Sequence, residues 1–307
     1  MVPLEGSLFH EHWWLAAVTG NQFSEVTDAR DGKVIGRLPY MVRRRRGFTV
    51  SEMPPFTRVL GPLVDPGSGK QASRMLRRFR IIGNLLDQLP RVDYFRQLLD
   101  IGNHDVQAFV NRGYEIGIEN TFRIDCRRTP SDIWGEMRDK TRNVIRRAEE
   151  KYQVASLQDP ERFVQFYKDS LHKRDKRNTI DFYRFGTLFS ECTAREQGKI
   201  IVAEGRDGAP AAMVFLVWDR SVMYYLLSAR DVEIADNGAV SLLIWRAILE
   251  AHQIGLQFDL DGITSDKLFQ FLSGFGGTIT TRPVAIRTTP LFNTLRHIRD
   301  LPKANWR

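Results

Sequence analysis

Three apolar runs between residues 199 and 229 constrain the fold more strongly than any other feature of the sequence. The runs are KIIVAEG, AAMVFLVW and SVMYYLLSA, and their β-branched and aromatic residues favour strands. The segments between them are Gly205-Arg206-Asp207-Gly208, rich in residues that tolerate tight turns, and Asp219-Arg220. The pattern therefore predicts a three-stranded meander.

A strong helix signal precedes the meander. Thr129-Pro130-Ser131-Asp132 supplies an N-cap, a proline at the first helical position and a carboxylate in the first turn. Apolar residues then recur mostly at steps of three and four as far as residue 148, which predicts one helix of about five turns. Another face carries Arg138, Arg142 and Arg146, four residues apart, and this ladder is either an anion-binding site or a solvated helix face.

The rest of the second half predicts a mixed domain. Around the meander we expect the strands Tyr152–Leu157, Gln257–Asp261 and Thr278–Arg287, and the helices Pro160 to about Arg174, Asp181 to about Gln197, Val240 to about His252, and Ser265–Ser273. The fold class is therefore α/β, of the α+β kind, with a mixed, largely antiparallel sheet flanked by helices.

The first half repeats part of this order more loosely. FVNRGYEIGIENTFRI (109–124) and FLSGFGGTITTRPVAIR (271–287) both run from a helix end through Gly and an aromatic residue into a threonine-bearing strand. A duplication predicts two similar domains, residues 1–125 and 126–290, followed by a C-terminal extension, residues 291–307. Two unrelated segments that each pass from a helix through a glycine into a strand would show the same match, so convergence remains an alternative.

The composition excludes several classes of protein. With 307 residues, 42% of them hydrophobic, the chain can fill ordinary cores, and its longest apolar run, Ala211–Trp218, is far shorter than the roughly 20 residues that cross a bilayer. The first residues lack the basic start and long apolar stretch of a secretory signal, so we expect a cytoplasmic protein without a transmembrane segment. Cys126 and Cys192 are too few for a disulfide scaffold or a cysteine-built zinc site.

The net charge of +8 predicts an anionic partner. Candidates are a nucleotide-bearing cofactor, an RNA, an anionic lipid surface or an acidic polymer. The arginine-rich segments 43–46 and 77–80 leave an RNA or peripheral membrane contact open beside a solvated surface. We expect no metal site, because His10 and His12 lie two apart rather than three or four, and no motif marks a covalent nucleophile.

Four segments together give the chain a family resemblance. DKTRNVIRRAEEKYQV (139–154), NGAVSLLIWRAI (237–248), FDLDG (258–262) and LFQFLSGFGG (268–277) resemble the GNAT acyltransferase superfamily. Within it the chain is similar to the tandem-domain branch that includes the Fem-type peptidoglycan aminoacyltransferases, and the first domain resembles a degenerate copy. The resemblance implies direct transfer of an acyl group from a thioester, or of an aminoacyl group from a tRNA ester, to an amine.

The resemblance also implies where the donor binds. Strand 223–228 would be splayed from its neighbour, so that backbone N–H groups can hold the donor carbonyl and its developing oxyanion. The helix that begins at Asn237-Gly238-Ala239 would offer N–H groups and a positive dipole end to a pyrophosphate or an RNA phosphate. Ser228 and Arg230 complete the implied cofactor site. The family's Arg or Gln followed by Gly-x-Gly or Gly-x-Ala is missing before this helix, which leaves the donor open.

The catalytic groups implied by the resemblance lie nearby in the sequence. Asp259 and Asp261 alternate on one strand and share a face, so either one accepts the proton of the attacking amine or both cap the following helix. Tyr225 would protonate the leaving group. The lysine that Fem-type proteins carry before the Gly-Phe-Gly element is absent, and Lys267 is the nearest substitute.

Three functions follow as hypotheses. The first is an N-acyltransferase that moves an acyl group from acyl-CoA, as co-substrate, to an amine of a sugar, amino acid or cell-envelope precursor. The second is a Fem-type aminoacyltransferase that uses aminoacyl-tRNA. The third is a module without catalytic activity that binds an anionic polymer through the arginine ladder.

Overall fold

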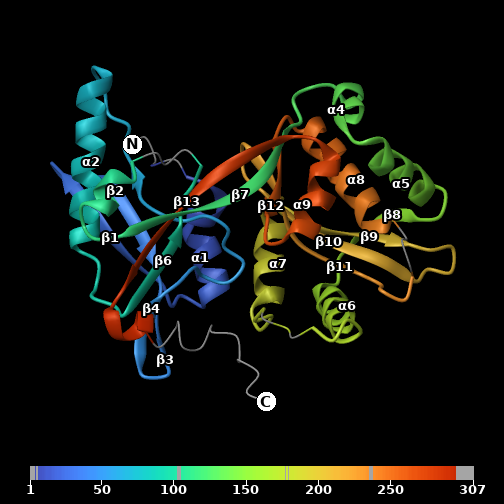
Figure 1. Ribbon diagram of the computed structural model, residues 1–307, viewed down its shortest axis with the longest axis horizontal. Coiled ribbons are helices and arrows are strands. Elements are labelled where there is room, and N and C mark those ends of the chain that lie inside the picture. The colour runs from blue at the N-terminus through green and yellow to red at the C-terminus, as the bar shows by residue number, and fades with distance from the viewer. Residues whose placement is uncertain are drawn as a thin grey trace, which may run out of the picture. The chain divides into compact units, whose positions relative to one another are not determined.

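The computed structural model describes residues 4, 6–101, 105–176, 178, 180–234 and 238–294. The chain divides into two compact units, the first comprising Met1–Glu119 with Arg282–Arg307 and the second Asn120–Thr281 (Figure 1). The division falls inside two long strands, β7 (Glu115–Asp125) and β13 (Thr278–Thr288), because each strand contributes residues to both units. It therefore differs from the boundaries predicted after residues 125 and 290. The interpretation of the first unit as a degenerate copy stays a prediction.

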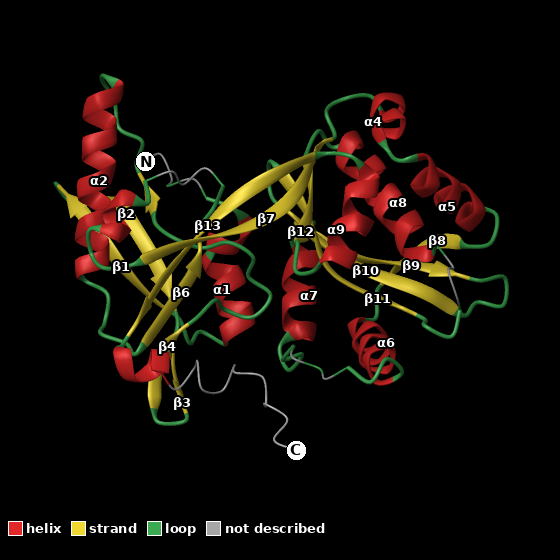
Figure 2. Ribbon diagram, in the orientation of Figure 1, coloured by secondary structure: helices red, strands yellow, loops and turns green. Residues whose placement is uncertain are grey.

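The second unit is built on a mixed sheet with the strand order β7-β12-β11-β10-β9-β8 (Figure 2). The predicted meander is confirmed, since β9 (Gly198–Glu204), β10 (Pro210–Trp218) and β11 (Val222–Arg230) are antiparallel neighbours. The outer strand β8 (Gln153–Leu157) pairs antiparallel with β9. On the other side, β12 (Gln257–Gly262) pairs parallel with β11, and the crossover that a parallel pair requires is α8 (Ala239–Gln253).

Helices cover both faces of this sheet, as Figure 2 shows. Successive side chains of β10 point to opposite faces: Val214 and Leu216 enter the core beneath α8, whereas the Phe215 ring lies 5.1 Å from the ring of Phe185. The helices of the α8 face are α4 (Pro130–Glu136), α5 (Asp139–Glu149) and α9 (Asp266–Leu272) with the short η2 (Ser273–Phe275), and those of the opposite face are α6 (Pro160–His172) and α7 (Phe185–Ala194). The mixed α/β fold class predicted from the sequence is confirmed.

The single helix of about five turns predicted after Thr129 is wrong, because the chain breaks it into α4 and α5. Met137 and Arg138 adopt extended backbone, with ψ of 145° and 141°. The N–H of Arg138 donates to the Gly274 carbonyl, 3.0 Å away, instead of continuing the helix. A tertiary hydrogen bond thus overrides the local periodicity, and Arg138 precedes α5 rather than lying on it.

The first unit has a small sheet formed by β1 (Ser24–Arg30), β2 (Lys33–Tyr40) and β5 (Leu63–Val64). Between residues 58 and 64, β5 and an isolated bridge from Leu60 to Leu99 are paired. The other elements of the unit are the strands β3 (Val42–Arg45), β4 (Phe48–Ser51) and β6 (Tyr94–Leu98), which pairs with β13, and the helices η1 (Leu8–His10), α1 (His12–Thr19), α2 (Gln71–Asp87) and α3 (Gln107–Val110).

Among the helices of the described ranges, none combines the length and apolarity needed to cross a membrane.

A buried histidine makes the first unit sensitive to pH. The His10 side chain is 1% exposed, and its Nδ1 lies 3.0 Å from the Ser7 hydroxyl oxygen. Burial lowers the pKa of His10 from 6.5 to about 4, against the opposing effect of the Asp100 charge. His10 therefore stays neutral in the folded chain at pH values where it is charged in the unfolded chain.

We predict that the free energy of unfolding falls as the pH is lowered from 6.5 to 4. Protonation then favours the unfolded chain, and the loss amounts to about 3 kcal/mol once both pKa values have been passed. His10→Gln should flatten this dependence, whereas His12→Gln, at a side chain that is 66% exposed, should preserve it. Urea unfolding across this pH range measures the effect, and equal pH slopes for wild type and His10→Gln would refute the assignment.

Candidate active site

The strands β11 and β12 separate near the middle of the sheet. Their parallel pairing joins Val222, Met223 and Tyr224 to Gln257, Phe258 and Asp259, and it ends there within the described residues. Both strands continue, β11 as far as Arg230 and β12 as far as Gly262. The splayed strand predicted for residues 223–228 is present, but it begins after Tyr224 rather than at Met223.

The side chain of Asp259 bends β12 away from β11. Its Oδ1 lies 2.9 Å from the N of Asp261 and 2.6 Å from the hydroxyl oxygen of Thr121, and its Oδ2 accepts from Nε of Arg123 at 2.9 Å. Asp261 adopts a left-handed φ of 65°, and the register of β12 against β7 shifts between Asp259 and Gly262. The backbone N–H of Asp261, two positions beyond the last paired residue, therefore points toward a carboxylate.

This arrangement corrects the prediction that Asp259 and Asp261 share one face of a regular strand. The left-handed residue breaks the alternation, so the two carboxyl groups have different surroundings. Asp259 is 0% exposed and ion-paired with Arg123, which gives it the role of holding backbone amides rather than that of a base. Asp261 is half-buried and lies close enough for its charge to act on Tyr225.

A bulge in β11 brings Tyr225 and Ser228 together. Phe215 and Leu216 of β10 pair with Leu227 and Tyr225, so Leu226 is the extra residue. The Tyr225 hydroxyl donates to the Ser228 hydroxyl, three positions along the strand. Burial raises the pKa of Tyr225, and the Asp261 charge adds to this, while the hydrogen bond to Ser228 opposes it. The tyrosine therefore remains a proton donor at neutral pH.

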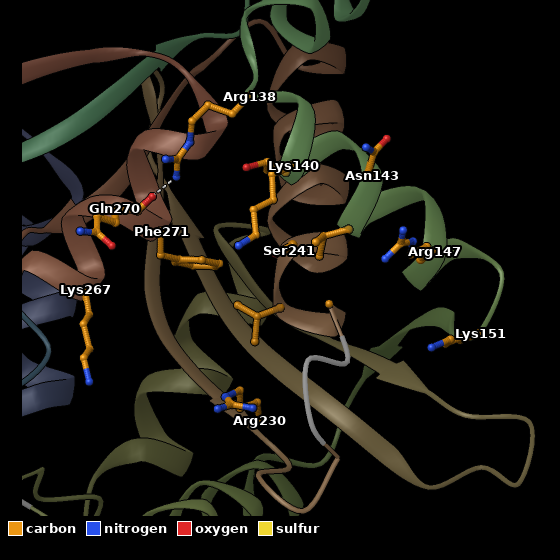
Figure 3. A pocket seen from close by; sticks show the side chains of 14 residues that line it. Arg138, Lys140, Asn143, Arg147, Lys151, Arg230, Ser241, Lys267, Gln270 and Phe271 are labelled. Atoms are coloured by element: carbon orange, nitrogen blue, oxygen red, sulfur yellow. Dashed lines mark hydrogen bonds between the residues drawn. The ribbon is translucent and has the colours of Figure 1, made fainter.

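A pocket of about 940 Å³ lies between α5, the start of α8, and α9 (Figure 3). Among the described residues that line it, six are cationic and none is acidic. The cations are Arg138, Lys140, Arg147, Lys151, Arg230 and Lys267, and the other lining residues are Thr141, Asn143, Val144, Gly238, Val240, Ser241, Gln270 and Phe271. Such a lining attracts an anion that carries several charges.

Two of the three arginines in the predicted ladder point elsewhere. Arg142 is paired with Asp139, and the Arg146 guanidinium lies 5.4 Å from the centre of the Trp134 ring. Only Arg138 lines the pocket, where its guanidinium donates to the carbonyl of Gln270. The ladder is split because Arg138 precedes the helix.

The other cations of the pocket lie along a neighbouring face of α5 and just past its end. Lys140, Val144, Arg147 and Lys151 follow one another at steps of four, three and four, and all of them line the pocket. This spacing, read from residue 140 instead of residue 138, is the signal that would have identified them.

Gly238 allows α5 to approach the start of α8. It has a φ of 67°, and a Cβ at this position would lie 2.9 Å from Cγ1 and 3.0 Å from the carbonyl oxygen of Val144. The space that the glycine leaves is thus taken by α5, and not by the phosphate that the sequence suggested. Gly238 at the N-cap position of α8 has no side chain, and the start of α8, with the positive end of the helix dipole, lies at the cationic pocket.

The other predicted site residues have different positions. Arg230 and Lys267 line the pocket, whereas Tyr225 and Ser228 are absent from its lining and belong to the bulge of β11. Ala239 is buried as the first residue of α8. Asn237 lies outside the described residues. No group of three or more His, Cys, Asp or Glu side chains in the described part of the chain could hold a metal ion.

Comparisons with known proteins agree with this geometry. Residues 135–267 match the model of the Acetyltransferase (GNAT) domain family. In structure the chain is similar to FemX, with 14% identity, a TM-score of 0.69 and 94% of each chain covered. It is also similar to L-PGS from Bacillus licheniformis, with 14% identity, a TM-score of 0.59 and coverage of 93% of this chain and 90% of that one.

A further similar structure is a tandem GNAT protein from the clavulanic acid biosynthesis pathway, with 10% identity, a TM-score of 0.53 and coverage of 90% and 87%. At such identities these likenesses show a shared fold. No curated protein matches the sequence. The family model confirms the predicted resemblance to the GNAT superfamily over residues 135–267.

We predict that Asp259→Asn strongly destabilises the chain. The substitution leaves Arg123, whose side chain is 15% exposed, without its countercharge, and breaking such a buried pair costs about 3–5 kcal/mol. The matched control is Asp125→Asn, because Asp125 pairs with Arg127 at exposed positions, where solvent screens the attraction and the pair contributes little to stability. Urea unfolding compares the two variants. Equal stabilities would mean that Asp259 does not hold β12 in its bent course.

Proposed function

We propose that the chain is an N-acyltransferase that moves an acyl group from acyl-CoA to an amine of a sugar, an amino acid or a cell-envelope precursor. The observation that carries the proposal is the six-cation pocket at the start of α8, in the same unit as the opening between β11 and β12. A donor whose phosphates bind in the pocket would reach the opening with its acyl end.

The pocket fits the chemistry of coenzyme A. A volume of about 940 Å³ lies within the range of cofactor sites, and the absence of acidic lining residues favours a molecule with several phosphates. Arg138 and Arg147 provide planar guanidinium groups, which bind phosphate oxygens through paired hydrogen bonds. The start of α8 adds the positive end of a helix dipole on the same side.

The residues at the opening supply the transfer chemistry. The amine nitrogen attacks the thioester carbonyl carbon, and backbone N–H groups of β11 beyond Tyr224 stabilise the oxyanion. The amine proton passes to Asp261, the carbon–sulfur bond breaks, and the sulfur takes a proton from Tyr225 through Ser228. Asp261 then releases its proton to water, and Tyr225 is reprotonated from water.

One observation favours aminoacyl-tRNA as a second candidate donor. The cations of α5 run from Lys140 to Arg147, a distance of about 10 Å along the helix, and Lys151 follows just past the helix end. A line of charge of this length can follow an RNA backbone beyond a single pyrophosphate. The third hypothesis, an anionic-polymer module, has lost support, because it depended on Arg142 and Arg146, and both face away from the pocket.

Ligand binding distinguishes the two donors. We predict that coenzyme A raises the melting temperature of the wild-type chain, because a ligand that binds only the folded form stabilises it. Arg147→Gln combined with Lys151→Gln should weaken binding about tenfold or more, because two charge-assisted contacts to phosphate are lost. Arg146→Gln, at an arginine that stacks on Trp134, is the matched control and should bind normally.

Stabilisation by aminoacyl-tRNA alone, steeply reduced by salt, would replace acyl-CoA with the RNA donor. If Arg146→Gln weakened binding as much as the double variant, the assignment of the pocket would be wrong.

Tyr225→Phe tests the chemical step separately. We predict a fall in kcat of about 10²-fold or more with little change in KM, because the hydroxyl acts on the leaving group and not on the bound phosphates. Tyr183→Phe, at a ring that is 84% exposed, serves as the control. Steady-state assays with acetyl-CoA measure both constants, and an unchanged kcat for Tyr225→Phe would remove the tyrosine from the mechanism.

A further inference from the structure

The first turns of α2 carry a pattern that the transfer reaction does not use. Residues 70–80, KQASRMLRRFR, contain five cations and no carboxylate. Every residue from Lys70 to Leu76 is exposed, and Met75 and Leu76 keep 61% and 49% of their surface in solvent. Figure 1 shows the start of α2 extending past the strands of the first unit.

The apolar residues of this segment share one side of the helix. Ala72, Met75, Leu76 and Phe79 stand at positions i, i+3, i+4 and i+7, the spacing of an amphipathic helix. Phe79 is partly buried and packs against the core that Ile81 and the later apolar residues of α2 enter. Ala72, Met75 and Leu76 therefore form the exposed part of the stripe, ahead of the part that the fold itself covers.

The neighbouring side chains keep this region positively charged. Asp65 is shared by Arg77, whose Nη2 is 3.2 Å away, and Lys33, whose Nζ is 3.6 Å away. The N–H of Gly67 and these two cations lower the pKa of Asp65, so its single charge is matched by two of opposite sign. Beside Lys33 the β1–β2 hairpin adds Val34, which is 42% exposed.

We propose that this surface, residues 70–80 of α2 with Lys33 and Val34, docks on an anionic phospholipid membrane. Exposed apolar side chains ringed by Lys and Arg suit the boundary between acyl chains and negative headgroups. The arginines alone would also suit RNA. The apolar side chains of Met75 and Leu76, however, are not stabilised by contact with phosphates, whereas their transfer out of water is favourable. The inference does not depend on the acyl donor, because it rests on the first unit alone.

Vesicle sedimentation of the full chain tests the proposal. We expect binding to vesicles that contain 30% phosphatidylglycerol, weak binding to pure phosphatidylcholine, and release at high salt. Met75→Ser with Leu76→Ser should reduce the partition coefficient about tenfold or more. Arg74→Gln with Arg80→Gln should reduce it about twenty-five-fold, since each cation near such a surface contributes about fivefold.

Matched controls lie elsewhere on the first unit. Leu291→Ser removes an apolar side chain that is 63% exposed, and Arg43→Gln with Arg44→Gln removes two exposed cations of β3; both variants should bind like wild type. Melting temperatures should be unchanged throughout, since all of these side chains are exposed. Equal binding to neutral vesicles would overturn the proposal, as would loss of binding in the controls. Binding to an RNA homopolymer that needs the arginines but not Met75 and Leu76 would assign the surface to RNA instead.

Discussion

The buried carboxylate of Asp259 is the interaction on which the rest of the second unit depends. A parallel pair of strands would ordinarily continue its ladder, and β11 has six further residues beyond the last pair. Asp259 ends the ladder because its carboxylate binds the backbone N–H of Asp261, two positions along its own strand, while Thr121 and Arg123 hold the carboxylate from β7. The strand opening is thus a consequence of side-chain chemistry inside the sheet, fixed before any substrate binds.

The pocket follows from a second local departure from regular structure. The hydrogen bond from Arg138 to Gly274 ends α4 and starts α5 in a new direction. Gly238 then allows α5 to pack against the start of α8, which places one cationic face of α5 along the pocket. Because Arg142 and Arg146 lie on another face, they bind Asp139 and Trp134 and leave the pocket to Lys140, Arg147 and Lys151.

The periodicity of apolar residues predicted the elements of this chain that pack regularly. The meander, the crossover helix and the opening near residues 223–228 could all be predicted. Arg138, Arg230, Gly238 and Lys267 were each singled out, but for separate roles, and the sequence did not indicate that they line one pocket. The role of Asp259 could not, because it depends on Thr121 and Arg123, which are more than 130 positions away in the sequence. Nor could the break at Arg138, since a distant carbonyl causes it and local propensity does not oppose a continuous helix.

The most direct test of the account is a crystal structure of the chain with a non-hydrolysable acetyl-CoA analogue. The account predicts phosphate density between α5 and the start of α8, and the analogue's carbonyl beside β11, just beyond Tyr224. Phosphates bound outside the six-cation pocket would contradict it. So would a structure in which β12 pairs with β11 beyond Asp259 and the analogue binds elsewhere.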